Sequence, residues 1–99
     1  MLIVGAFKAL IISNLRKGMN GLKICYSKQA LKFLQKQDKK TQIRIITAIE
    51  LIPSGDIKKL QGNEQYYRLR IGDFHVIFSK EGKIISIVKI DNRGQIYRR

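Results

Sequence analysis

The segment 67–78 alternates apolar and polar residues on either side of a central Gly72–Asp73 pair. Alternation with a period of two is typical of β-strands, because successive side chains of a strand point to opposite faces of the sheet. Glycine accepts the positive φ that a two-residue hairpin loop requires. We therefore predict a β-hairpin in which Ile71 pairs with Phe74.

This pairing groups the polar side chains of the hairpin. Counting back from the turn places Arg70 opposite His75, and Arg68 opposite Ile77 on the same face. The other face receives Tyr67, Leu69, Val76 and Phe78. Two guanidinium groups and an imidazole on one surface suggest a phosphate-binding site.

The charge of the chain points to a polyanionic partner. Its 99 residues, enough for a single domain, include 20 Lys and Arg against 7 Asp and Glu, a formal net charge of +13. Such a surface attracts nucleic acid or the ribosome, although a merely soluble basic surface is the plainer alternative. One cysteine, Cys25, and one histidine cannot form an internal disulfide or a cluster of soft metal ligands. We expect no metal and no cofactor.

Residues 1–18 differ in composition from the rest of the chain. The apolar run 1–12 is interrupted by Lys8 and is shorter than the roughly 20 residues of a membrane-spanning helix. It also lacks the early basic residues of a secretory signal. We expect a cytoplasmic protein without membrane contact, with an N-terminal extension at 1–18 and one domain at 19–99. The extension could be an amphipathic helix, a partner-binding arm, or residues upstream of a second start at Met19.

The first half of the domain is predicted to hold a strand and two helices. A strand at 22–26 precedes Ser27, which can cap a helix that runs to about residue 37. Asp38 can cap a second helix that runs to about residue 52, before Pro53. The apolar face of this second helix is predicted to contain Ile43, Ile45, Ile46, Ile49 and Ile52. Lys28, Lys32 and Lys36 are predicted to form a solvated stripe on the first.

The second half is predicted to be a meander. Residues 53–63 are polar and rich in turn formers, and strands are expected at 66–71, 74–79 and 83–91. The order is βααβββ. The predicted fold class is therefore α+β, with a helical hairpin packed on a small, mainly antiparallel sheet.

Three motifs, in this order, resemble the RelE/ParE superfamily of toxins from type II toxin–antitoxin modules, and the RelE branch is favoured. They are Lys58–Gly62, Tyr67–Phe78 and Asp91–Tyr97. The resemblance extends over residues 22–99 and implies a RelE-like fold. For the RelE branch it also implies a metal-independent endoribonuclease that cleaves mRNA in the ribosomal A site. The implied partners are the ribosome, mRNA and a cognate antitoxin in a hetero-oligomer.

The resemblance also assigns roles to residues. Arg68 and Arg70 match basic strand residues of RelE-like enzymes, and Arg93 and Tyr97 match the C-terminal Arg and Tyr. The arginines suit a pentacoordinate phosphate, and Tyr97 could stack on a base or help to move a proton. Further RNA contacts are expected from Lys58, Lys59, Arg98 and Arg99.

His75 departs from the pattern, because many relatives carry arginine at this position. An imidazole could act as general acid or general base, and nearby guanidinium groups favour its neutral form. Simpler interpretations stay open: His75 as a structural polar residue, the strand arginines as solvated side chains, and Tyr97 as a cover for the sheet edge. A ParE-like inhibitor of DNA gyrase and a non-enzymatic basic RNA- or ribosome-binding module are the alternative functions.

Overall fold

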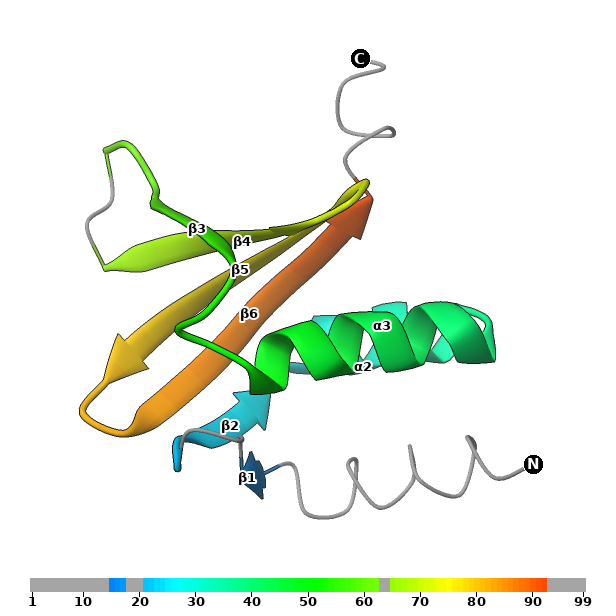
Figure 1. Ribbon diagram of the computed structural model, residues 1–99, viewed down its shortest axis with the longest axis horizontal. Helices are drawn as coiled ribbons and strands as arrows, with labels where there is room; N and C mark the ends of the chain where they lie inside the picture. The colour runs from blue at the N-terminus through cyan, green and yellow to red at the C-terminus, as the bar shows by residue number, and fades with distance from the viewer. Residues whose placement is uncertain (1–14, 18–20, 63–64, 93–99) are drawn as a thin grey trace.

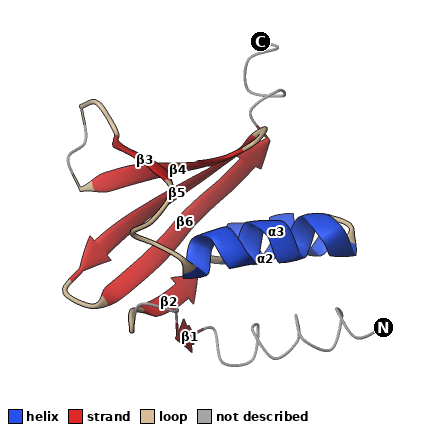
Figure 2. Cartoon of the chain, in the orientation of Figure 1, coloured by secondary structure: helices blue, strands red, loops and turns tan. Residues whose placement is uncertain are grey.

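The computed structural model describes residues 15–17, 21–62 and 65–92. In this part of the chain, two helices lie on one side of a six-stranded sheet of order β1-β2-β6-β5-β4-β3 (Figures 1 and 2). The elements are β1 (Leu15–Lys17), β2 (Lys23–Tyr26), α2 (Lys28–Gln35), α3 (Lys39–Glu50), β3 (Asp56–Lys59), β4 (Tyr66–Ile71), β5 (Phe74–Glu81) and β6 (Ile84–Asn92). The predicted α+β class and helical hairpin are confirmed.

Both helices begin at the predicted caps. The side chain of Ser27 accepts a hydrogen bond from the Ala30 amide at 3.1 Å, and that of Asp38 accepts one from the Thr41 amide at 2.8 Å. These bonds satisfy backbone donors that have no partner within the helix. Gln42 of α3 then joins the two helices, because its Nε2 donates to the Leu34 carbonyl at 2.6 Å.

The sheet is mainly antiparallel, as predicted, with one parallel pair. β4, β5 and β6 form the predicted meander, and β2 pairs in parallel with β6. β1 pairs antiparallel with β2, so residues 15–17 of the predicted N-terminal extension belong to the sheet. Residues 53–63 were expected to be polar and turn-rich, with no strand, and the absence of a strand is wrong at 56–59, where β3 pairs with β4.

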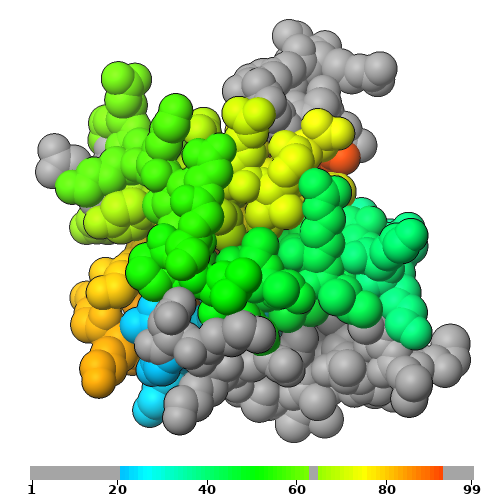
Figure 3. Space-filling model, in the orientation of Figure 1, coloured from blue at the N-terminus to red at the C-terminus, as the bar shows by residue number. Residues whose placement is uncertain are grey.

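The predicted hairpin register is confirmed. Ile71 pairs with Phe74 and Arg70 with His75, and Gly72 has a φ of 57°. The guanidinium of Arg44, on α3, lies where a Cβ at residue 72 would project. Figure 3 accordingly shows the surface of α3 meeting that of the β4–β5 hairpin. The positive φ therefore favours glycine at the turn, whereas the end of the flexible Arg44 side chain can move aside.

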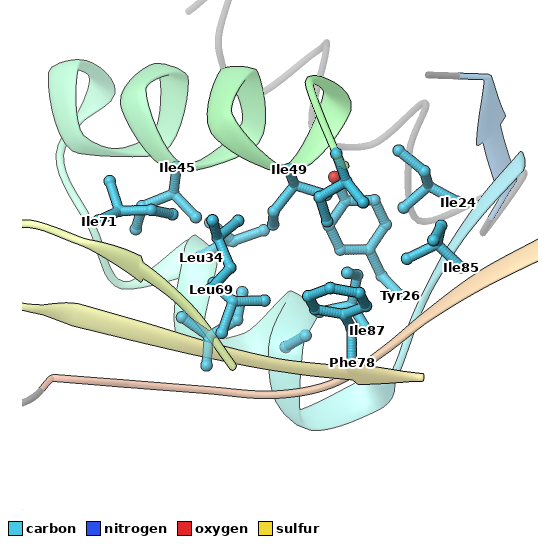
Figure 4. Packing of buried hydrophobic residues seen from close by; sticks show 14 residues of the cluster. Ile24, Tyr26, Leu34, Ile45, Ile49, Leu69, Ile71, Phe78, Ile85 and Ile87 are labelled. Atoms are coloured by element: carbon cyan, nitrogen blue, oxygen red, sulfur yellow. The ribbon is translucent and has the colours of Figure 1, made fainter. Parts of the chain in front are cut away.

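The core lies between the helices and the facing side of the sheet (Figure 4). Ala30, Leu34, Ile45 and Ile49 of the helices are completely buried there, at 0 % exposure. The strands contribute Ile24, Tyr26, Leu69, Ile71, Val76, Phe78, Ile85, Ile87 and Ile90.

One predicted core residue of α3 is outside the core. Ile43 is 47 % exposed, because it lies two residues, or about 200° around the helix, from the buried Ile45. The lysine stripe of α2 is exposed as predicted. No helix in the described ranges is long and apolar enough to cross a membrane.

Side chains of the α2 N-terminus bind the edge of β6 beyond the end of β2. Ser27 Oγ donates to the Val88 carbonyl at 2.7 Å. Gln29 Nε2 donates to the Ile90 carbonyl at 3.1 Å, and Gln29 Oε1 accepts from the Ile90 amide at 3.0 Å. The side-chain amide of Gln29 thus bonds to the backbone of β6 as a neighbouring strand would. It holds β6 at Ile90, the residue before Asp91.

Candidate nucleic-acid interface

The side of the sheet opposite the helices carries the predicted cations. We call this side the helix-free face. Register pairs place Asp56, Arg70, His75 and Asp91 in one row across β3, β4, β5 and β6. Because directly opposed residues share a face, their Cβ atoms lie roughly 4.5–5.5 Å apart between neighbouring strands. The predicted neighbourhood of Arg70 and His75 is therefore part of a longer polar row.

A second row lies beside the first. It consists of Lys58, Arg68, Ile77 and Lys89, again one residue from each of the four strands. Residues two apart on a strand lie on the same face, so Arg68 and Arg70 are neighbours within β4. On these two rows, four cationic side chains and one imidazole stand beside two carboxylates. The face is electropositive and suits an anion.

Burial differs among the members of the two rows. His75 is only 8 % exposed, whereas the side chain of Arg70 is 45 % exposed. The Nε of Arg68 is buried and has no hydrogen-bond partner among the described residues. A buried guanidinium donor without a partner is costly, and a phosphate oxygen would satisfy it.

Two ion pairs lie at the ends of the Arg70–His75 row. Arg70 Nε is 4.0 Å from an Asp56 carboxylate oxygen, between two half-exposed side chains. Lys89 Nζ is 3.2 Å from a carboxylate oxygen of Asp91, whose side chain is 29 % exposed. Exposed pairs of this kind contribute little to stability, roughly 0–1 kcal/mol, so Arg70 can exchange its carboxylate for a phosphate at small cost.

The structure groups some of the predicted site residues and separates others. Lys58 joins Arg68, because the two are register partners. Lys59 pairs with Tyr67 and therefore belongs to the opposite face of the edge strand. The remaining predicted site residues, Arg93, Tyr97, Arg98 and Arg99, lie outside the described residues. β6 ends at Asn92 opposite Phe74, beside the β4–β5 turn.

Sequence reasoning missed Lys89 and Asp91 as members of this face. Strict alternation from the buried Ile85 and Ile87 would turn residue 89 toward the core. A bulge in the β5–β6 ladder shifts the register by one residue, so Ile90 is buried instead. The spacing of three between Ile87 and Ile90 is the sequence signal that could have revealed this shift.

The chemistry of the face is that of an anion site that includes one imidazole. In the described ranges, no group of three or more His, Cys, Asp or Glu side chains could hold a metal ion. The arginines can bind a phosphate in the plane of their donors, and the imidazole beside them is a group that can donate or accept a proton.

Comparison with known proteins identifies the family. Residues 24–97 match the family model described as the ParE toxin of the type II toxin–antitoxin system parDE. The chain belongs to this family. It is a toxin of the RelE/ParE superfamily, as its resemblance implies. No curated protein sequence matches the chain.

Solved structures place this toxin on the RelE and YoeB fold. A chain of the RelB–RelE antitoxin–toxin complex from Methanococcus jannaschii matches with 29 % identity and a TM-score of 0.62, over 74 % of this chain and 94 % of that one. The RelE–RelB complex of Pyrococcus horikoshii matches with 32 % identity and a TM-score of 0.60, over 73 % of this chain and 94 % of that one. The YoeB dimer of Staphylococcus aureus matches with 26 % identity and a TM-score of 0.58, over 69 % of this chain and 92 % of that one. The fold and the toxin assignment therefore agree.

Proposed function

We propose that this toxin is a metal-independent endoribonuclease that cleaves mRNA on the ribosome and so inhibits translation. The observation that carries the proposal is the row in which Arg70 lies opposite His75, beside Arg68, on the helix-free face. Phosphate-binding donors and a proton-transfer group thus share one surface. The formal charge of +13 favours binding to ribosomal and messenger RNA.

Cleavage of RNA without a metal is an internal transfer. The 2′-hydroxyl loses its proton to a base and its oxygen bonds to phosphorus, while the bond from phosphorus to the 5′-oxygen breaks. An acid returns a proton to the departing 5′-oxygen. The products are a 2′,3′-cyclic phosphate and a 5′-hydroxyl. The chain must supply cationic donors for the phosphorane and at least one group for proton transfer.

Residues of the helix-free face match these tasks. Arg68 and Arg70 stabilise the extra negative charge on the phosphorane. The Nε of Arg68, which has no hydrogen-bond partner within the described ranges, is one of the donors. His75 transfers a proton, and Lys58 binds a neighbouring phosphate. We assign Arg93 to the phosphate and Tyr97 to base stacking or proton transfer on the basis of the family motif.

The proton-transfer role of His75 is separable from RNA binding. We expect His75→Ala to slow cleavage more than it weakens RNA binding, because the imidazole acts on protons while the arginines hold the phosphate. Single-turnover cleavage and equilibrium binding, measured on the same programmed ribosomes, report the two effects. Equal losses of rate and affinity would reject the role.

Arg93 and Tyr97 can be tested in cells. We expect Arg93→Ala or Tyr97→Ala to relieve growth arrest and to leave antitoxin binding largely intact. Co-purification with the antitoxin is the control for folding. Full toxicity in both variants would remove these residues from the site.

DNA gyrase is the second candidate target, because the matching family model describes ParE. Sequencing mRNA ends during translation distinguishes the two. Cuts within ribosome-occupied codons support the endonuclease, whereas double-strand DNA breaks trapped by gyrase support the ParE-like inhibitor. Neither product would indicate a non-enzymatic RNA- or ribosome-binding module.

We also propose a cognate antitoxin as the partner of this toxin. Structural neighbours include the RelB–RelE and YoeB–YefM complexes. A net charge of +13 is complementary to an acidic partner segment. Co-expression with the neighbouring open reading frame should give a complex that neutralises arrest. Removing residues 1–18 tests the N-terminal extension, and unchanged arrest would indicate that it is dispensable.

A further inference from the structure

Asp91 begins the third family motif, which gives this residue no role, and it is a candidate partner of His75. The two residues are register partners in the β5–β6 ladder, directly opposite each other on the helix-free face. At a Cβ separation of roughly 4.5–5.5 Å, a carboxylate and an imidazole can meet. His75 is 8 % exposed and the Asp91 side chain 29 %, so water would screen a contact between them only in part.

Asp91 is held in place from two sides. Its carboxylate is 3.2 Å from Lys89 Nζ, within the same strand. The preceding residue, Ile90, exchanges two backbone hydrogen bonds with the side chain of Gln29. The bulge of β6 brings Lys89 and Asp91 onto this face together. A carboxylate restrained in this way can orient a neighbouring ring.

We propose that Asp91 is a positioning residue that orients the His75 imidazole and favours its protonated form. This inference rests on the proposed endonuclease function, because it assigns His75 the role of proton donor to the departing 5′-oxygen. Arg70 opposes Asp91 from the other side of His75, so the protonation of the imidazole reflects both neighbours. His75 is protonated in the ground state, and its proton goes to the 5′-oxygen when the P–O5′ bond breaks.

The charged groups that face His75 have opposite effects. A carboxylate directly opposite an imidazole favours its protonated form, whereas a guanidinium on the other side favours the neutral form. The adjacent row contains Arg68, Lys58 and Lys89. Asp56 lies on the far side of Arg70 from His75, and its carboxylate is near the Arg70 guanidinium. Of these groups, Asp91 is the only carboxylate directly opposite His75 among the described residues.

The test is an NMR titration of the full-length toxin. His75 is the only histidine of the chain, so its ring ¹⁵N signals are assigned without ambiguity. We expect Asp91→Asn to lower the pKa of His75 by about one unit and to change its tautomer ratio. Asp91→Glu should restore much of the pKa, because it keeps the charge. Glu81→Gln, at the far end of β5, is the matched control and should change neither property.

The same variants are then assayed for cleavage of ribosome-bound mRNA over a range of pH. The proposal is supported if, in Asp91→Asn, the pH at which the cleavage rate declines moves by the same amount as the pKa of His75. An unchanged pKa and tautomer ratio would overturn it, and wild-type cleavage would then still support the endonuclease. A changed pKa with an unchanged rate profile would also overturn it. If the wild-type toxin cuts no mRNA, the endonuclease proposal itself fails, and the positioning role fails with it.

Discussion

The two faces of the sheet differ in what their side chains do. The helix-covered face is a continuous apolar layer in which Leu69, Val76 and Phe78 are at most 2 % exposed. The helix-free face carries Arg68, Arg70 and His75 on the same two strands, and Lys89 on β6. Strict alternation thus gives β4 and β5 one face for stability and one for chemistry. Substitutions on the two faces should therefore affect different measurements.

The largest expected effect comes from removing a phosphate donor of the helix-free face. We expect Arg68→Gln to reduce mRNA cleavage on ribosomes by about 100- to 1000-fold, because it removes a cation from the developing charge. Folding should change little. Single-turnover cleavage and thermal unfolding measure the two quantities.

The control for Arg68→Gln is Lys32→Gln, which removes the same charge from the exposed side of α2. A general loss of electrostatic attraction would reduce cleavage similarly in both variants. Equal effects would contradict the distinction between the faces.

On the helix-covered face, we expect a loss of stability. Leu34→Ala should lower the free energy of unfolding by about 2–5 kcal/mol, because Leu34 is 0 % exposed and its removal leaves a cavity. Ile43→Ala is the control, since Ile43 is 47 % exposed, and it should cost less than about 1 kcal/mol. Denaturant unfolding compares the two. Similar losses would show that the described core does not govern stability.

A smaller effect is expected where a helix fixes the site strand. Gln29→Ala removes both hydrogen bonds to Ile90 and should cost about 1–3 kcal/mol. The amide of Ile90 should also exchange faster with deuterium. Gln35→Ala, on the exposed side of the same helix, is the matched control. Unchanged protection of the Ile90 amide would rule out this contact as the anchor of β6.

The smallest effect concerns the cap of α3 and depends on pH. Hydrogen bonds from the side chain and backbone of Thr41 hold the pKa of Asp38 below its usual value of 3.8. Because the folded-state pKa is lowered, the carboxylate stabilises the fold above pH 3.8 and loses this effect as the pH falls through the folded value. The stability difference between wild type and Asp38→Ala should therefore shrink in strong acid. A difference independent of pH would contradict the charged cap.

The parts of the fold that local chemistry determines were predictable. A two-residue turn at Gly72–Asp73 leaves one register for the hairpin, so the pairing of Arg70 with His75 followed from the sequence. Ser27 and Asp38 marked both helix starts in the same way.

The features that the sequence did not predict depend on contacts between residues that are far apart in the chain. β3 has polar residues on both faces and is a strand because β4 pairs with it at the sheet edge. Lys89 and Asp91 reach the helix-free face through a bulge against β5. The bond between Gln29 and Ile90 joins residues 61 positions apart, and no local pattern reports it.

Lysine footprinting on programmed ribosomes tests the central claim most directly. Lys58 and Lys89 lie on the helix-free face, whereas Lys28 and Lys32 lie on α2 and Lys36 caps its C-terminus. Acetylation of the toxin, with and without mRNA-loaded ribosomes, is followed by mass spectrometry. We predict strong protection of Lys58 and Lys89 and little protection of the three helix lysines. Protection of the α2 lysines, with Lys58 and Lys89 still reactive, would contradict the assignment of the helix-free face to RNA.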